Sequence, residues 1–153
     1  MKKIISVLVV MMVFMGMQAL AADMATKQEC MDKCKAASDL VQKVGLDEAL
    51  VTLNDKNGPF VWKDTYVFCV DMDRATVLAH PIKPVLIGKD LIGMKDANGK
   101  MFFVEFIETA KNDQQGWVEY MWPKPGEDTS SPKDTYVYRV PGRDILVAAG
   151  IYK

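Results

Sequence analysis

A short aromatic stretch with a period of two constrains this fold more than any other segment. Residues 116–126 place three large aromatic side chains within six positions and end in a Pro/Gly-rich loop. Alternate side chains of a strand point to opposite faces of a sheet, so we expect Tyr120 and Trp122 on one face and Trp117 on the other. Buried Tyr and Trp need partners for the hydroxyl and the indole N–H. With Lys133 nearby in the sequence, this strand is typical of a pocket wall.

The N-terminal residues indicate export from the cytoplasm. Two lysines precede an apolar run over residues 4–17, and small residues follow up to Ala21. This order is that of a secretory signal peptide, which we expect over residues 1–21 with cleavage after Ala21. An uncleaved membrane anchor is the alternative, because the apolar run has a marginal length for a span. We therefore predict a periplasmic or secreted protein.

The remaining chain, residues 22–153, has the length of one domain with one core. Without Lys2 and Lys3, the 19 basic residues become 17, against 20 acidic ones. This balance argues against nucleic acid as a partner, because nucleic-acid binding needs a basic face. We expect a single domain over residues 22–153.

Three cysteines, Cys30, Cys34 and Cys69, leave several alternatives open. In an oxidising compartment, one disulfide plus one free thiol is compatible with this number. Cys30 and Cys34 lie one helical turn apart and would pair only with distortion, whereas either would reach Cys69 across the core. All three also fit the role of small buried apolar residues. Neither a haem attachment motif nor a zinc-binding pattern accompanies the single histidine, so we expect no cofactor and no metal.

Helical spacing and strand alternation occupy separate parts of the chain. Thr26 and Glu29 form a capping box before a helix that ends at Gly45. The further elements that we expect are a helix over 46–53, a hairpin of strands 65–71 and 76–80, an irregular segment 82–95, a helix introduced by 96–99, the aromatic strand, a polar loop 124–133, and strands 135–140 and 145–152. This segregation predicts an α+β fold: a five-stranded antiparallel sheet with a long N-terminal helix on one face and a crossing helix on the other. A cavity would form on the second face.

Two polar residues are candidates for chemistry near that cavity. His80 ends a strand before Pro81, where it is either a satisfied structural residue or a hydrogen-bond donor at a pocket mouth. Lys133 is either solvated or supplies the positive charge that an anionic ligand needs. The sequence contains no hydrolase motif, phosphate-binding loop or metal-binding His pair, which indicates that the protein is not an enzyme.

Six segments carry a resemblance to a known family. They are YVFCVD (66–71), LAHP (78–81), Asp96 with Gly99, the aromatic stretch (116–126), SPK (131–133) and AGIY (149–152). With these segments the chain resembles the single Cache domain of the second type over nearly all of residues 22–153. Cache domains are PAS-like extracytoplasmic sensor modules, so the resemblance implies a five- to six-stranded antiparallel sheet behind a long helix. Members usually form the periplasmic part of chemotaxis receptors and sensor kinases, and this branch often binds short carboxylates.

The resemblance also implies the ligand-binding residues. Carried over by position, they are His80, Tyr120, Trp122 and Lys133, with Trp117 and Tyr136 as further candidates. Because alternation separates Trp117 from Tyr120, we expect only one of these two in the pocket and favour Tyr120. Lys133 would neutralise the carboxylate, Tyr120 and His80 would donate hydrogen bonds, and Trp122 would pack against the apolar tail.

We therefore expect a periplasmic protein that binds or senses a small organic acid such as acetate, propionate, lactate or pyruvate. The sequence ends at Lys153 without an output module, so its partner would be a membrane receptor, a sensor kinase or a transporter. The alternative is an interaction module without a ligand, which would form a homodimer or bind a partner through its N-terminal helix. A small enzyme is a third hypothesis, for which only His80 is a candidate group.

Overall fold

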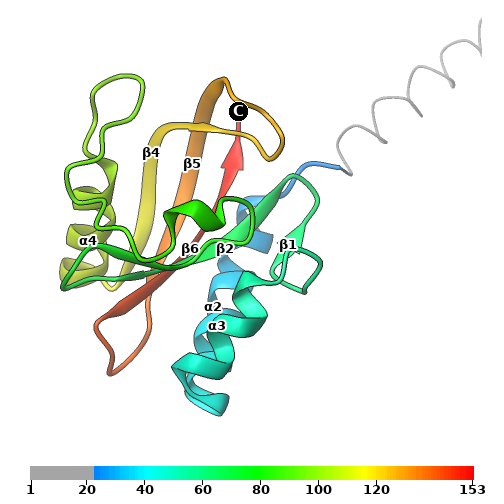
Figure 1. The fold of residues 1–153 in the computed structure, drawn as a ribbon, viewed down its shortest axis with the longest axis vertical. Helices are drawn as coiled ribbons and strands as arrows, with labels where there is room; N and C mark the ends of the chain where they lie inside the picture. The colour runs from blue at the N-terminus through cyan, green and yellow to red at the C-terminus, as the bar shows by residue number, and fades with distance from the viewer. Residues whose placement is uncertain (1–22) are drawn as a thin grey trace, which may run out of the picture.

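The computed structural model describes residues 23–153, which form helices on both sides of one sheet (Figure 1). In chain order the elements are α2 (Lys27–Val44), α3 (Leu46–Asn54), β1 (Val61–Trp62), β2 (Thr65–Asp71), β3 (Thr76–Ala79), the 3-10 helix η1 (Pro84–Leu86), α4 (Phe102–Asn112), β4 (Gln115–Pro123), β5 (Ser130–Arg139) and β6 (Ile145–Tyr152). The predicted signal peptide lies outside the described residues. None of the helices in the described part combines the length and the apolar character that a membrane span requires.

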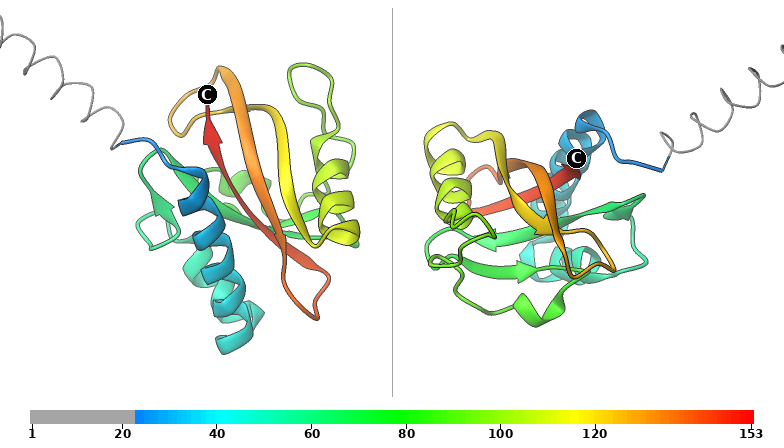
Figure 2. Two further views of the ribbon diagram at one scale, coloured as in Figure 1. Left: turned by 180° about the vertical axis from the view of Figure 1, so that it is seen from behind. Right: turned by 90° about the horizontal axis from the view of Figure 1, so that it is seen from above.

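The sheet has six strands, and every pairing in it is antiparallel. Its main path runs β1-β2-β6-β5-β4, and β3 pairs with β2 beside this path. The C-terminal strand β6 therefore lies in the middle, between β2 and β5. Figure 2 shows α2 and α4 on opposite sides of the sheet. The predicted α+β class and the placement of the two helices are confirmed.

Helices α2 and α3 cover one face of the sheet. The predicted capping box starts α2: the Glu29 backbone N–H donates to Thr26 Oγ1 at 3.2 Å, and the Thr26 N–H donates to Glu29 Oε2 at 2.9 Å. Gly45 ends this helix with a φ of 87°, a left-handed value that glycine adopts without strain. The buried cluster on this face consists mainly of small and aliphatic side chains: Cys30, Cys34, Ala37, Val41, Ala49, Leu53, Phe60, Val67, Cys69, Ala79, Tyr136, Val140, Ile145, Val147 and Ala149.

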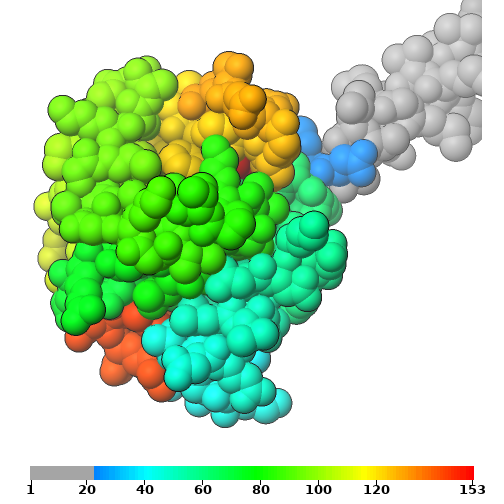
Figure 3. All heavy atoms as spheres, viewed as in Figure 1, coloured from blue at the N-terminus to red at the C-terminus, as the bar shows by residue number. Residues whose placement is uncertain are grey.

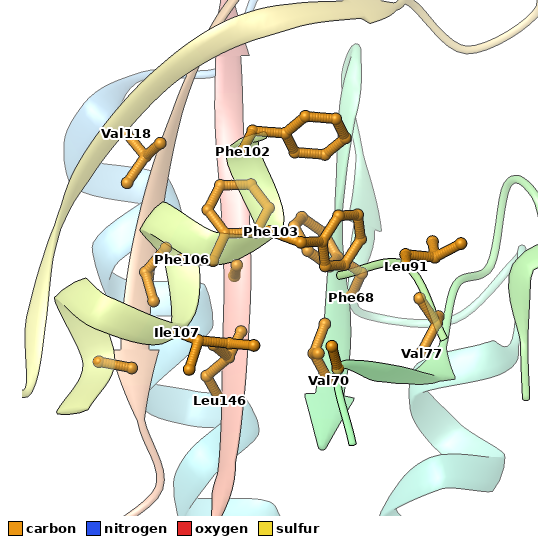
Figure 4. Packing of buried hydrophobic residues seen from close by; sticks show 14 of the residues in the cluster. Phe68, Val70, Val77, Leu91, Phe102, Phe103, Phe106, Ile107, Val118 and Leu146 are labelled. Atoms are coloured by element: carbon orange, nitrogen blue, oxygen red, sulfur yellow. The ribbon is translucent and has the colours of Figure 1, made fainter. Parts of the chain in front are cut away.

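Helix α4 covers the other face with a row of aromatic side chains. Phe102, Phe103 and Phe106 point from α4 toward Phe68 on β2 and the neighbouring core residues (Figure 4). The segment over residues 82–95, drawn green in Figure 3, crosses the molecule in front of this region. It adds Leu86 and Leu91 to the same buried cluster, so the α4 side has its own core.

The structure corrects one boundary that matters for function. Strand β5 begins at Ser130, whereas the sequence predicted a loop up to Lys133 and a strand from residue 135. Pro132 is tolerated because β6 ends at Tyr152, so the N–H that proline lacks would have met no strand residue there. Lys133 therefore belongs to the sheet rather than to a surface loop. The two-residue strand β1 was not predicted.

Candidate functional site

The face covered by α4 encloses a small aromatic cavity. Tyr120 and Trp122 point to this face from β4, and the Tyr120 ring stacks on Phe102 with 4.4 Å between the centroids. The cavity has a volume of about 10 Å³, which is room for about one water molecule. Its lining comes from β2, the end of β3, η1, α4 and β4: Tyr66, Phe68, His80, Leu86, Phe102, Phe103, Phe106, Tyr120 and Trp122.

Lys133 lies on the same face with its side chain completely buried. The residue is 0% exposed, and its Nζ has no hydrogen-bond partner among the described residues. The Nζ atom lies 4.4 Å from the ring centroid of Tyr66, 4.8 Å from that of Tyr152 and 5.9 Å from that of Phe68. Tyr66 and Phe68 also line the cavity, so the ammonium group and the cavity share these two rings. We call the cavity, its lining residues and Lys133 the aromatic niche.

Burial changes the charge state of Lys133. Aromatic faces attract a cation, but they replace only part of the hydration that an ammonium group has in water. Burial therefore lowers the pKa of Lys133 from 10.5 to about 7. The weaker opposing effect comes from the neighbouring Cys30 and Asp64. Near neutral pH this lysine is close to the point where it loses its charge.

Gly150 on β6 provides the space in which the Lys133 side chain lies. Lys133 pairs with Tyr152 in the register of β5 and β6, and Thr135 pairs with Gly150. A Cβ at position 150 would lie 2.9 Å from Lys133 Cε and would overlap Thr135 Oγ1. Any side chain at this position would displace the lysine stem. The absence of a Cβ at Gly150 thus positions the ammonium group over Tyr66.

His80 borders the cavity as a neutral ring. Its backbone N–H donates to Asn54 Oδ1 at 2.9 Å, and its Nδ1 accepts from the Lys83 backbone N–H at 2.9 Å. Because Nδ1 accepts, the ring proton is assigned to Nε2. Burial, followed by the positive charges of Lys133 and Lys83, lowers the pKa of His80 to about 3. The imidazole is therefore uncharged at neutral pH, and Nε2 is a donor.

Hydroxyl and indole groups hold the rings of the niche in place. Trp122 Nε1 donates to the Tyr66 hydroxyl at 3.1 Å, and Thr135 Oγ1 donates to the Tyr120 hydroxyl at 3.4 Å. The Tyr152 hydroxyl donates to a main-chain carbonyl at the end of β4 at 3.0 Å. Burial raises the pKa of Tyr66 to about 12 and raises that of Tyr120 well above its ordinary value. These phenols stay protonated and neutral across the physiological range.

Trp117 and Tyr136 lie on the opposite face of the sheet. Both belong to or pack against the cluster under α2, and their ring centroids are 5.3 Å apart. The Tyr136 hydroxyl donates to Gln115 Oε1, and Lys27 Nζ lies 4.4 Å from the Trp117 ring. Side chains alternate between the two faces along β4 and β5, and this alternation places Trp117 and Tyr136 on the face opposite to Tyr120. These two predicted residues are therefore outside the niche.

The structure brings the other four predicted residues together and adds partners to them. His80, Tyr120 and Trp122 line the cavity, and Lys133 lies next to it. Sequence reasoning did not name the lining residues Tyr66, Phe68, Leu86, Phe102, Phe103 and Phe106. For Tyr66 and Phe68 the signal was present, since they alternate on the same face of one predicted strand.

Comparison with known proteins identifies the family. The sequence profile of the family described as Single Cache domain 2 matches residues 4–153. The chain belongs to this family.

Proteins similar to this Cache domain include chemotaxis sensors. It is 29% identical to the methyl-accepting chemotaxis protein McpP of Pseudomonas putida over 89 residues, which are 58% of the chain and 16% of that relative. A solved periplasmic sensor domain of a chemotaxis protein is 29% identical, with a TM-score of 0.64 over 80% of this chain and 86% of that one. A Cache chemosensory domain described in terms of carboxylic acid recognition is 25% identical, with a TM-score of 0.72 over 82% of this chain and 91% of that one.

The cysteines of the Cache domain are free thiols on the α2 side. Cys30, Cys34 and Cys69 are all buried and form no disulfide. Burial raises the pKa of Cys30 and of Cys69 to about 12, so neither forms the reactive thiolate. The Cys34 thiol donates to the Tyr136 carbonyl oxygen at 3.8 Å, and otherwise the three side chains pack as small apolar residues. Over residues 23–153, no three His, Cys, Asp or Glu side chains are grouped as metal ligands would be.

Proposed function

We propose that this Cache domain is an extracytoplasmic sensor domain that binds a short carboxylate in the aromatic niche. The observation that carries the proposal is the Lys133 ammonium group, which is buried without a hydrogen-bond partner beside an apolar cavity. An unpaired buried charge is costly, and an anion placed next to it offsets that cost. The similarity to a domain described in terms of carboxylic acid recognition supports the same ligand class.

The geometry suggests a role for each polar group of the niche. The Lys133 ammonium would pair with the carboxylate, and charge-assisted hydrogen bonds of this kind are the strong ones. His80 Nε2 would donate to the second carboxylate oxygen, because the Nδ1 atom is already engaged by Lys83. The phenyl and indole rings from β4 and α4 would surround the short apolar tail.

The size of the cavity favours short acids over long ones. A volume of about 10 Å³ holds less than a carboxylate of four heavy atoms occupies, so binding requires lining side chains to move apart. Each further methylene would need a larger displacement of well-packed rings, and overpacking of this kind is unfavourable. Acetate, propionate, lactate and pyruvate are therefore the acids to test first.

The wider setting of the domain follows from the export signal and the relatives. We infer that it works in the periplasm after cleavage of residues 1–21, and that it passes ligand occupancy to a membrane receptor, a sensor kinase or a transporter. The matched segment is only 16% of the McpP chain.

A second candidate function is an interaction module without a ligand. The small volume of the cavity favours it, since the rings already fill most of the niche. In that case the domain would associate with a partner or with a second copy through α2. A measured affinity for a short carboxylate would support the sensor function, and the lack of any such affinity would support the interaction module.

A thermal-shift screen at pH 6 tests the proposal. The purified protein would be heated with each of the four acids in excess, with sodium chloride at equal ionic strength as the reference. A ligand at 100 times its Kd stabilises a protein by about 2.7 kcal/mol, which corresponds to a Tm shift of roughly 5–10 °C for a domain of this size.

Two lysine variants make the screen specific for the niche. Lys133→Met removes the buried charge and should abolish the shift, whereas Lys153→Gln removes an exposed lysine near the same end of the sheet and should leave it unchanged. No shift with any acid, in protein shown by mass spectrometry to carry no co-purified acid, would refute carboxylate binding. A Tm shift that persists in Lys133→Met would show that the acid binds outside the niche.

A further inference from the structure

We infer that the aromatic niche takes up a proton together with its ligand, so that the domain responds to a carboxylate and to acidity at once. This inference rests on the proposed carboxylate function. It adds that Lys133 is the group that carries the proton, and that affinity for the anion falls as the pH rises above neutral.

The first support is that none of the carboxylates in residues 23–153 forms an ion pair with Lys133. Asp134 is the next residue, but its side chain points to the other face and pairs with Lys27 at 2.6 Å. Asp64, before β2, accepts a hydrogen bond from the Ala25 backbone N–H at 2.7 Å. Among the described carboxylates, Asp64 favours the charged state of Lys133, and burial outweighs its effect.

The second support is that every other titratable side chain facing Lys133 is neutral. Tyr66 from β2, Tyr152 from β6 and Tyr120 from β4 are phenols whose pKa values burial raises. On the α2 side, burial raises the pKa of the Cys30 thiol to about 12. The neutral rings and thiol leave the ammonium group with aromatic faces as its main compensation.

The remaining groups around the niche are a histidine, a lysine and the phenyl rings of α4. Burial lowers the pKa of His80 to about 3, so its ring stays neutral from pH 5 to pH 9. Lys83, whose Nζ lies 5.1 Å from the Trp122 ring, adds a positive charge that opposes a second one nearby. From α4, the niche receives the apolar rings of Phe102, Phe103 and Phe106.

These surroundings couple the proton to the ligand. Without a counter-charge, burial brings the pKa of Lys133 down to about 7, whereas a bound carboxylate restores the preference for the ammonium form. Above this pKa the neutral amine must gain a proton from solvent as the anion enters, and the product is an ammonium–carboxylate pair. By linkage, the apparent Kd then rises by a factor of about ten for each pH unit above 7 and is flat between 6 and 7.

Isothermal titration with the best-bound of the four acids tests the coupling. Between pH 6 and pH 9 we expect the apparent Kd to rise by roughly a hundredfold. At pH 8.5, titrations in two buffers of different ionisation enthalpy should reveal uptake of nearly one proton per ligand, and at pH 6 close to none. Lys153→Gln should reproduce the whole profile. His80→Gln should bind more weakly but keep the slope, because His80 does not supply the proton.

The outcomes separate this inference from the proposed function. An acid that binds with the same Kd from pH 6 to pH 9 and without proton uptake would overturn the coupling and leave carboxylate binding intact. If none of the acids binds at pH 6, both fall. An NMR titration of lysine 13Cε signals, with the Lys133 signal assigned by its loss in Lys133→Met, gives a measurement that needs no ligand. A midpoint near 7 supports the inference, and a midpoint near 10.4, the ordinary lysine value, contradicts it.

Discussion

On the α2 side of the sheet the buried side chains are mostly small or aliphatic, whereas the α4 side has six aromatic rings among its buried residues and includes a lysine. Both faces are made by the same strands. On β4, Trp117 belongs to the first face, and Tyr120 with Trp122 belongs to the second. The α2 side is a core that stabilises the fold, and its buried carboxylate, Asp134, is paired with Lys27. The α4 side keeps a buried charge, which lowers stability unless something binds.

Replacing Lys133 should have the largest effect, because it removes this difference between the faces. Lys133→Met should abolish carboxylate binding and raise the Tm at pH 6 by roughly 5 °C. The folded-state pKa of about 7 lies below the ordinary 10.5, so the penalty of the buried charge is complete below pH 7 and disappears as the pH rises toward 10.5. The gain in Tm should therefore shrink between pH 6 and pH 9, as measured by differential scanning fluorimetry. An equal gain at both values would contradict a buried ammonium group.

A cavity on the α2 side should affect stability alone. Leu53 on α3 is 0% exposed, and Leu53→Ala should cost about 2–5 kcal/mol in the free energy of unfolding. Chemical denaturation measures this loss. The Kd for the carboxylate at 15 °C, where the variant stays folded, should remain that of the wild type. A large change in Kd would mean that the two faces are not independent.

The missing side chain at Gly150 leaves the space that the Lys133 side chain occupies. Gly150→Ala would place a Cβ against Lys133 Cε and Thr135 Oγ1, with an expected cost of about 1–3 kcal/mol and weaker carboxylate binding. Gly93→Ala is the matched control, because a Cβ at Gly93 meets no atom within 4 Å. Denaturation and titration calorimetry on both variants compare the two. Unchanged carboxylate binding in a folded Gly150→Ala protein would show that the Lys133 side chain does not need the space at Gly150.

The buried histidine should make stability depend on acidity on the α4 side. Its folded-state pKa of about 3 lies below the ordinary 6.5, so its contribution is present above pH 6.5 and is lost as the pH falls toward 3. Urea denaturation at pH 7 and pH 5.5 should give a loss that is about 1 kcal/mol larger for the wild type than for His80→Gln. Equal losses in the two proteins would argue for a solvated, ordinarily titrating ring.

The smallest effect is expected for an aromatic residue on the α2 side. Trp117→Phe keeps a ring against Tyr136 and weakens the contact with Lys27, so it should cost about 0.5–1 kcal/mol. Carboxylate affinity should not change. A marked loss of carboxylate binding in Trp117→Phe would place Trp117 in the site.

The alternation of side chains along strands explains how much of the fold and of the niche could be predicted from the sequence. The period of two assigned Tyr120 and Trp122 to one face and separated them from Trp117, and helical spacing placed α2 and α4. Lys133 was predicted at the end of a polar loop, and its burial depends on the register that sets it beside Gly150. The cavity volume depends on how the Phe102, Tyr120 and Trp122 rings pack against each other, which no local pattern in the sequence encodes.

Lys133 and Asp134 are consecutive residues, and a single peptide bond joins the candidate ligand contact to the residue that holds α2 through Lys27. The peptide unit between Lys133 and Asp134 is planar and rigid, so the backbones of these two residues move together. A shift of the main chain at Lys133 would therefore also move Asp134, whose carboxylate pairs with Lys27 of α2. The two faces of the sheet are thus linked through neighbouring residues of one strand.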